Sequence, residues 1–194
     1  TADCHLHTTF STDGESAPED MIKKGIEKGL TAMCFTEHMD YGIDYEEGPD
    51  AFQTDTETYY TTFCNMKEKY SGNINLFFGI ELGLTPSITE FIRHYVKKYP
   101  FDFIIGSSHT VGGIDPYYPA FFEGRTEEEA YRLYFEAELA CAKIFTDFDV
   151  YGHLDYVLRY GPSQNKNFTY QKYGDILDEL MKTLIQNGKG IECL

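Results

Sequence analysis

The sequence predicts an α/β fold built on a mainly parallel sheet, and two observations support this. Strand-like apolar segments alternate with helical segments along nearly all of the 194 residues, and this order produces parallel strands joined by crossover helices. Residues of metal-ligand type also recur where successive predicted strands end. An open doubly wound sheet and a barrel both fit the alternation, but a barrel brings its strand ends to one mouth. We therefore expect a barrel.

The predicted elements of the first half begin with a short apolar stretch at residues 2–6. Ser16 and Glu19 have the spacing of a capping box, and Pro18 falls in the first turn, so a helix is expected to begin there. This helix should end at Gly29, since glycine is common just after a helix. The next predicted elements are a strand at 31–36, a helix at 55–70 and a strand at 74–80.

The second half repeats the pattern with two more capped helices. Ser87 and Glu90 have capping-box spacing and should open a helix that ends near Lys98. Thr126 should cap a long helix whose apolar positions follow the helical period: Ala130, Leu133, Tyr134, Ala137, Cys141 and Ile144. The remaining predictions are strands at 101–106, 148–152 and 190–194, a helix at 169–187, and loops at 39–53 and 110–125 that wall the site.

Length and composition indicate one folded globular domain over residues 1–194. Hydrophobic residues make up 42% of the chain and aromatic residues 16%, which is typical of a packed core. No apolar run reaches the roughly 18 residues of a membrane span, and no secretion signal is recognisable. The five cysteines are scattered without a Cys-x-x-Cys spacing, so they are expected to be reduced core residues of a cytoplasmic protein.

The net charge of −16 limits the partners that the chain is expected to bind. Such a charge repels phosphate backbones and anionic lipids, so neither a nucleic acid nor a membrane is an expected partner. A small phosphorylated substrate remains compatible, because bound divalent ions reverse the charge locally. The oligomeric state does not follow from the sequence.

Histidines and acidic residues fall at the ends of five consecutive predicted strands. His5 and His7 follow the first apolar stretch, and the alternation of a strand directs both imidazoles to one side. The later members of the series are His38, Glu81, His109 and His153. Each residue alone has an ordinary structural explanation, but their recurrence predicts a multinuclear metal site and hence a hydrolase.

These residues lie in a series of motifs that resembles a known superfamily. The motifs are Asp-Cys-His-Leu-His, Thr-Glu-His-Met-Asp, Gly-Ile-Glu, Gly-Ser-Ser-His and Gly-His-Leu-Asp. Their order is similar to that of the polymerase-and-histidinol-phosphatase (PHP) superfamily. The loops Gly-Gly-Ile-Asp-Pro-Tyr-Tyr and Gly-His-Leu-Asp-Tyr-Val-Leu-Arg-Tyr further resemble the histidinol-phosphate phosphatases within it. The resemblance implies a distorted (β/α)7 TIM-like barrel with up to three divalent ions, Zn, Mn or Fe, at its C-terminal mouth.

The resemblance also implies a ligand set for each ion. Carried onto this chain, the sets are His5, His7 and Glu81 for the first ion, Glu81 with His109 and His153 for the second, and Asp13 with His38 for the third. The family has a further Asp-x-His pair near the end of the barrel, and no such pair follows residue 155 here. We therefore expect a barrel truncated at its C-terminal end, with a weakened or incomplete metal cluster.

The implied reaction is hydrolysis of L-histidinol phosphate to L-histidinol and phosphate, a step of histidine biosynthesis. Bound ions would generate hydroxide from water at neutral pH, and Arg159 would be the catalytic cation that forks two phosphate oxygens. The residues expected to bind the substrate with Arg159 are Asp115, Tyr117 and Tyr160. Glu37 and Asp155 are expected to orient the imidazoles of the metal ligands.

Two alternatives remain open at this point. The same site could serve another PHP-type phosphoesterase, such as a phosphotyrosine-protein phosphatase or a nucleotide phosphatase. The chain could also be a metal-binding barrel without turnover, a reading supported by the absent Asp-x-His pair.

Overall fold

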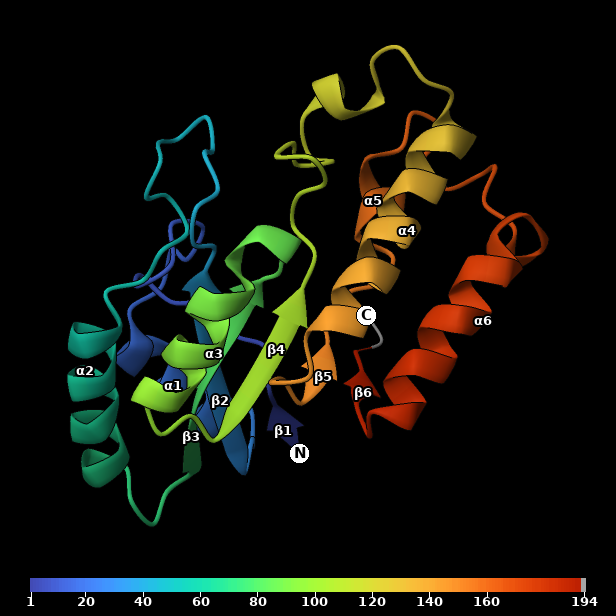
Figure 1. Ribbon diagram of the computed structural model, residues 1–194. Coiled ribbons are helices and arrows are strands. Elements are labelled where there is room, and N and C mark those ends of the chain that lie inside the picture. Colours follow the sequence, from blue (N-terminus) through green and yellow to red (C-terminus); the bar gives the residue numbers. More distant parts are fainter. Residues whose placement is uncertain (193–194) are drawn as a thin grey trace. The chain divides into compact units, whose positions relative to one another are not determined.

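The computed structural model describes residues 1–192 and has an α/β fold with a six-stranded sheet (Figure 1). The strands follow one another in chain order: β1 (Ala2–Asp3), β2 (Ala32–Met39), β3 (Asn75–Gly83), β4 (Phe103–Ser107), β5 (Val150–Tyr151) and β6 (Gly190–Ile191). The pairs β1–β2, β2–β3 and β5–β6 are parallel. The predicted α/β class and parallel strand pairing are confirmed.

Helices connect the strands, as the alternation predicts. The α-helices are α1 (Pro18–Glu27), α2 (Thr56–Lys69), α3 (Thr89–Lys98), α4 (Glu127–Ile144), α5 (Tyr156–Tyr160) and α6 (Tyr170–Gln186), and the 3-10 helices are η1 (Pro86–Ile88) and η2 (Pro119–Phe122). Neither α5 nor η2 is predicted by the sequence, because segments of five and four residues are too short to show a helical period. No helix in residues 1–192 combines the length and the apolar character that crossing a membrane requires.

The chain divides into two compact units. Unit 1 comprises Thr1–Leu82 and His94–Ile105, and unit 2 comprises Gly83–Arg93 and Gly106–Leu194. Each unit has its own hydrophobic cluster. The single domain predicted for residues 1–194 stays a prediction.

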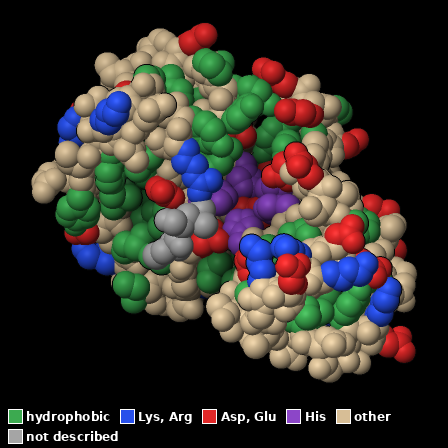
Figure 2. All heavy atoms as spheres, turned by 180° about the vertical axis from the view of Figure 1, so that it is seen from behind, with side chains coloured by type: hydrophobic (Ala, Val, Ile, Leu, Met, Phe, Trp, Pro, Cys, Tyr) green, Lys and Arg blue, Asp and Glu red, His purple; other side chains and the backbone are tan. Residues whose placement is uncertain are grey.

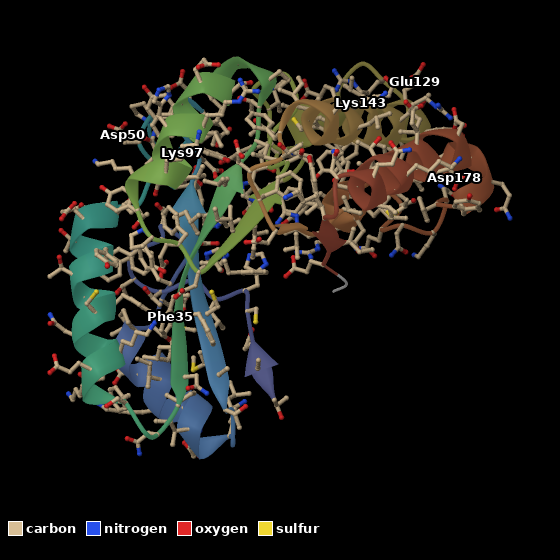
Figure 3. The ribbon with its side chains drawn as sticks, turned by 60° about the horizontal axis from the view of Figure 1, so that its bottom comes forward. Phe35, Asp50, Lys97, Glu129, Lys143 and Asp178 are labelled. Carbon is tan, nitrogen blue, oxygen red and sulfur yellow. The ribbon has the colours of Figure 1, made fainter. Side chains whose placement is uncertain are left out.

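The core of unit 1 forms where α1 and α2 cover β2 and β3. Ile22 of α1, Phe35 of β2 and Phe78 of β3 are each at most 2% exposed (Phe35 is labelled in Figure 3). Burying a side chain of this size contributes roughly 1.5–3 kcal/mol. Tyr59 of α2 donates its hydroxyl proton to the carbonyls of Phe35, at 2.8 Å, and Gly79, at 3.0 Å. The helix is thereby tied to the two strands whose ends carry His38 and Glu81.

The core of unit 2 lies between α4 and α6. Tyr131, Tyr134 and Phe135 of α4 are buried with Tyr173 and Ile176 of α6. At the surface, charged pairs join the two helices: Arg132 with Asp175, at 3.0 Å, and Lys143 with Glu179. Lys143 and Glu129 of α4 and Asp178 of α6 are labelled in Figure 3.

The helix caps follow the sequence signals only in part. Thr126 forms the predicted capping box with Glu129 and opens α4, and Gly29 follows α1 with φ +78°, as its glycine-stop prediction requires. The predicted Ser16 cap is wrong, since Ala17 precedes α1 and makes no side-chain cap bond. The predicted Ser87 cap is wrong as well, because Ser87 lies inside η1.

The predicted burial needs two corrections. Leu133 and Ile144 follow the helical period of α4, but they are 37% and 40% exposed, because the buried stripe is shifted toward Tyr131 and Phe135. Of the cysteines, Cys34 and Cys141 are buried whereas Cys4 and Cys64 are exposed, so a core role fits only the first two. Cys193 and the end of the strand predicted at 190–194 lie outside the described residues.

Candidate metal centre

His38 and Glu81 stand opposite each other near the ends of two neighbouring strands. They are Cα partners in the parallel register of β2 and β3, and both are buried, at 7% and 0% exposure. Nδ1 of His38 lies 3.3 Å from Oε2 of Glu81. A carboxylate this deeply buried is costly unless cationic or hydrogen-bonding groups surround it. The sequence prediction placed both residues at strand ends, and the structure brings their side chains together.

His5 and His7 approach the same oxygen of Glu81. Their Nε2 atoms lie 3.1 and 3.2 Å from Oε2, and 3.1 Å from each other. Leu6 lies between them in the chain and exchanges hydrogen bonds with Thr36 of β2, which fixes the segment that follows β1. The side chains of His5 and His7 remain 17% and 20% exposed, and histidine side chains are visible on the molecular face that Figure 2 draws.

These separations fit a bound divalent ion. Imidazole and carboxylate ligands lie about 2.0–2.2 Å from zinc, so neighbouring ligand atoms of a tetrahedral ion stand roughly 3.3–3.6 Å apart. The ligand atoms of His5, His7 and Glu81 all lie within 4.8 Å of one another. Three nitrogen and oxygen donors of this kind suit zinc, manganese or iron. The donor set is thus chemically and geometrically suited to such an ion.

Asp13, His7 and His38 form a second set of possible metal ligands in unit 1. Its Oδ2 lies 3.4 Å from Nε2 of His38, and the rings of His38 and His7 stack with centroids 4.1 Å apart. Burial raises the pKa of the Asp13 carboxyl, but the hydrogen bond with His38 and the charges of His38 and His7 outweigh it and lower this pKa. Ligand atoms of His7, Asp13 and His38 again lie within 4.8 Å of one another.

Glu37 organises the backbone that carries these groups. It is fully buried and accepts hydrogen bonds from the amide and the hydroxyl of Thr8, at 3.0 and 2.7 Å, and from the hydroxyl of Ser11, at 2.6 Å. The Ser11 oxygen in turn accepts from the amide of His38, at 3.0 Å, and lies 3.5 Å from Nδ1 of His7. Glu37 was predicted to orient the imidazoles, and the structure connects it with His7 and His38 through the Ser11 hydroxyl. The sequence did not indicate this part for Ser11.

In unit 2, the side chains of His109 and His153 lie side by side. They follow β4 and β5 by two residues each, they are buried, and their ring centroids lie 5.4 Å apart. The Ser108 hydroxyl lies 2.6 Å from the hydroxyl of Tyr151, so the residue before His109 is bonded to the last residue of β5. Glu192, just after β6, accepts from the amide of His153 at 3.2 Å.

The residues predicted to bind substrate are also in unit 2. Asp115 is 9% exposed and accepts hydrogen bonds from the Tyr156 hydroxyl, at 3.1 Å, and from the Tyr117 amide, at 2.7 Å. Burial and the charge of Asp115 raise the pKa of Tyr156. Tyr160 packs its ring edge on both Tyr117 and Tyr156, with centroids 5.4 and 5.1 Å away. The guanidinium carbon of Arg159 lies 5.9 Å from the centre of the Tyr156 ring.

Comparison with known proteins decides the family. Residues 3–194 match the PHP domain family. This chain belongs to the PHP domain family. It is 33% identical to a histidinol-phosphatase of Lactococcus lactis subsp. lactis (strain IL1403) over 191 residues, which are 98% of this chain and 70% of the relative. It is 31% identical to a probable histidinol-phosphatase of Clostridium acetobutylicum, over 98% of this chain and 71% of the relative.

Solved structures of PHP relatives agree with the fold. The crystal structure of the Lactococcus lactis histidinol phosphate phosphatase, complexed with zinc, L-histidinol and phosphate, matches with a TM-score of 0.92 and 32% identity. The match covers 99% of this chain and 72% of that chain. A putative histidinol phosphatase from Listeria monocytogenes, at 20% identity, matches with a TM-score of 0.76 and supports the fold alone.

The sequence did not indicate three residues that contact the candidate site residues. Glu192 follows an apolar strand just as Glu81 does, and that repeated placement was the available signal. Ser11 and Tyr156 had none, since their contacts with Glu37 and Asp115 join segments far apart in the chain. Asp155, whose expected role in orienting an imidazole stays a prediction, precedes α5 and makes no side-chain cap bond. Burial raises the pKa of the Glu138 carboxyl, and the charge of Asp155 raises it further.

Proposed function

We propose that this PHP chain is a metal-dependent phosphatase that hydrolyses L-histidinol phosphate to L-histidinol and phosphate. The observation that carries the proposal is the position of one buried carboxylate oxygen of Glu81. It lies within 3.3 Å of three imidazole nitrogens of unit 1, those of His5 and His7 after β1 and that of His38 on β2. The relative of known structure was crystallised with zinc, L-histidinol and phosphate.

In this proposal His5, His7 and Glu81 hold one divalent ion, and Asp13 with His38 hold another. His109 and His153 of unit 2 supply further imidazole ligands. Bound divalent ions of this kind lower the pKa of water and neutralise phosphoryl charge. Glu37 keeps the Thr8–Ser11 turn in place through its three donors, so that His7 and His38 meet their ions in fixed orientations.

The substrate-binding role belongs to residues around Tyr156. Arg159 carries five donors in a planar fork that matches two phosphate oxygens, and it is exposed next to this ring. Asp115 offers carboxylate oxygens suited to an ammonium or an imidazolium, which the two ends of a histidinol molecule provide. Tyr117 and Tyr160 form an aromatic edge beside it that suits an imidazole ring.

The finer architecture is part of the proposal. We assign the six strands in chain order to a distorted (β/α)7 barrel, in which these 194 residues supply most of the elements. The structural match that covers 99% of this chain supports this assignment. We also propose a cytoplasmic location, because the biosynthetic role proposed here and reduced cysteines are both typical of that compartment. If the biosynthetic role is wrong, this location loses its main support.

The test is phosphate release from a panel of phosphomonoesters by protein loaded with zinc, manganese or iron. We expect histidinol phosphate to be hydrolysed with the highest kcat/KM, above a phosphotyrosine peptide and nucleoside monophosphates. Faster turnover of one of these would move the chain to another PHP-type phosphoesterase. Bound metal without release from any ester would show a barrel without turnover.

The matched variants are His7→Asn and His94→Asn. His94 lies exposed on α3, so its replacement should leave turnover unchanged, whereas His7→Asn should lower it more than about 100-fold by removing a ligand. Equal activity of the two variants would contradict the proposed centre.

A further inference from the structure

Phe52 has a backbone conformation that its side chain disfavours. Its φ is +59°, in the left-handed region where a bulky aromatic residue is rare. Glycine or asparagine would adopt this conformation with less strain. Residues held in such conformations persist only where the surrounding structure determines them, and they cluster at functional sites. The contacts of Phe52 therefore indicate what the strain maintains.

Two backbone hydrogen bonds hold Phe52 in this conformation. Its amide donates to the hydroxyl of Thr12 at 3.1 Å, and its carbonyl accepts from the amide of Asp40 at 2.9 Å. The amide of Thr54 then donates to the carbonyl of His38 at 3.0 Å. The loop between β2 and α2 (Figure 1) thus returns to the end of β2 at His38.

The ring of Phe52 contacts His38 directly. The two ring centroids lie 5.2 Å apart with an interplanar angle of 89°, an edge-to-face contact. On its other side the Phe52 ring packs against Tyr45, at 4.7 Å, and the Tyr45 hydroxyl donates to the carboxylate of Asp40. The ring is therefore held between His38 and the loop that follows it.

The same residue reaches the partner of His38 through its backbone. Thr12, which accepts from the Phe52 amide, directly precedes Asp13, and Asp13 lies 3.4 Å from His38. Phe52 thus contacts His38 with its ring, and its amide is bonded to Thr12, the residue before Asp13. No other described residue between β2 and α2 has a positive φ without being glycine.

We propose that Phe52 is a positioning residue that holds Asp13 and His38 at the separation needed to bind one divalent ion. The proposal rests on the proposed function only in taking Asp13 and His38 as metal ligands. The strained backbone places the ring on His38 and the amide on Thr12 at the same time. A glycine would satisfy the backbone alone and would remove the edge-to-face contact of the Phe52 ring with His38.

The experiment is a zinc titration of metal-free Phe52→Gly protein, with thermal unfolding of the same sample measured without metal. Glycine keeps the left-handed backbone accessible and removes the ring. We expect the most weakly held ion to bind at least tenfold less tightly, as for other groups that orient ligands. Phe52→Tyr retains the ring and should restore the affinity. Unchanged zinc affinities in Phe52→Gly would overturn the proposal.

A matched control and a second variant keep the result decisive. Gln164→Gly relieves another positive φ, of 50°, in unit 2, and it should leave zinc affinity unchanged. Thr12→Val removes the hydroxyl acceptor with little change in shape and should weaken zinc binding without changing the metal-free unfolding temperature. If Phe52→Gly unfolds too early to titrate, an unchanged affinity in Thr12→Val overturns the proposal. Zinc binding by the wild type without phosphate release would defeat only the proposed function.

Discussion

His38 and Glu81 occupy paired positions of two parallel strands, and the distance from Nδ1 to Oε2 is 3.3 Å. Strand pairing alone brings an imidazole and a carboxylate together, so this part of the centre is set by two strands whose residues are mostly buried. The ligands from His5, His7 and Asp13 lie on loops that must be fixed by other means.

Replacing Glu81 by Gln should separate charge from shape. The amide has nearly the same volume but carries no negative charge, so we expect phosphatase activity to fall more than about 100-fold, beyond the effect of groups that only orient ligands. Metal content after gel filtration should fall with it. Glu90→Gln, on an exposed side chain of α3, is the control. A fully loaded and active Glu81→Gln protein would contradict the assignment of Glu81 as a ligand.

Glu37→Gln should weaken both folding and metal binding. The carboxylate accepts from Thr8 and Ser11, and hydrogen bonds to a charged group contribute about 1.5–3 kcal/mol. We expect urea unfolding of the metal-free protein to show a loss of about 2 kcal/mol. Zinc affinity should drop about 10–100-fold because Ser11 no longer fixes His7 and His38. A loss of stability with intact zinc affinity would limit Glu37 to a folding role.

Periodicity and capping chemistry predicted much of the fold because they depend on neighbouring residues. The Thr126 capping box and the Gly29 stop are confirmed. The prediction that Ser16 caps α1 is wrong, because the helix begins after Ala17. The Ser16 carbonyl instead accepts a hydrogen bond from the amide of Thr9, in the loop before the helix. A local sequence pattern therefore cannot show which of two adjacent residues becomes the N-cap when the preceding loop contacts one of them.

The ligand types of the candidate site were visible in the sequence, and their supports were not. His5, His7, His38 and Glu81 recur at strand ends, and strand ends meet in space. Phe52 and Tyr156 act through contacts with residues 14 to 41 positions away, and nothing local distinguishes them from other loop aromatics. Their contacts can be seen only in the three-dimensional structure.

The hydroxyl pair beneath the histidines of unit 2 should be strongly coupled. Ser108 and Tyr151 are almost fully buried, with their oxygens 2.6 Å apart. Tyr151→Phe leaves the Ser108 hydroxyl without this partner, so a loss of about 1–3 kcal/mol in unfolding free energy is expected. Adding Ser108→Ala should recover part of it, which a double-mutant cycle would measure. Strict additivity of the two losses would show that the bond contributes nothing.

Glu19 should make the attachment of α1 to α2 sensitive to acid. Hydrogen bonds from Lys69, Lys23 and Tyr70 lower the pKa of Glu19 from 4.5 to about 2. A lowered pKa means that the stabilisation is complete above the unfolded value near 4.5 and disappears as the pH falls toward 2. Glu19→Gln should therefore lower the unfolding temperature at pH 7 and differ less from wild type at pH 2–3. Glu68→Gln, exposed on α2, should show no such convergence.

Metal removal should lower the thermal stability of the folded chain by mass action. An ion present at 100 times its dissociation constant stabilises the state that binds it by about 2.7 kcal/mol, or roughly 5–10 °C for a chain of this size.

A chain with a net charge of −16 also attracts cations without specific sites, so calcium at equal ionic strength must be compared with zinc. We expect zinc to raise the unfolding temperature of wild type and Glu90→Gln, and calcium to have little effect. Glu81→Gln should lose the zinc-dependent increase, because its amide cannot neutralise an ion held by His5 and His7. An equal increase in all three proteins would mean that the zinc binds elsewhere on the acidic surface.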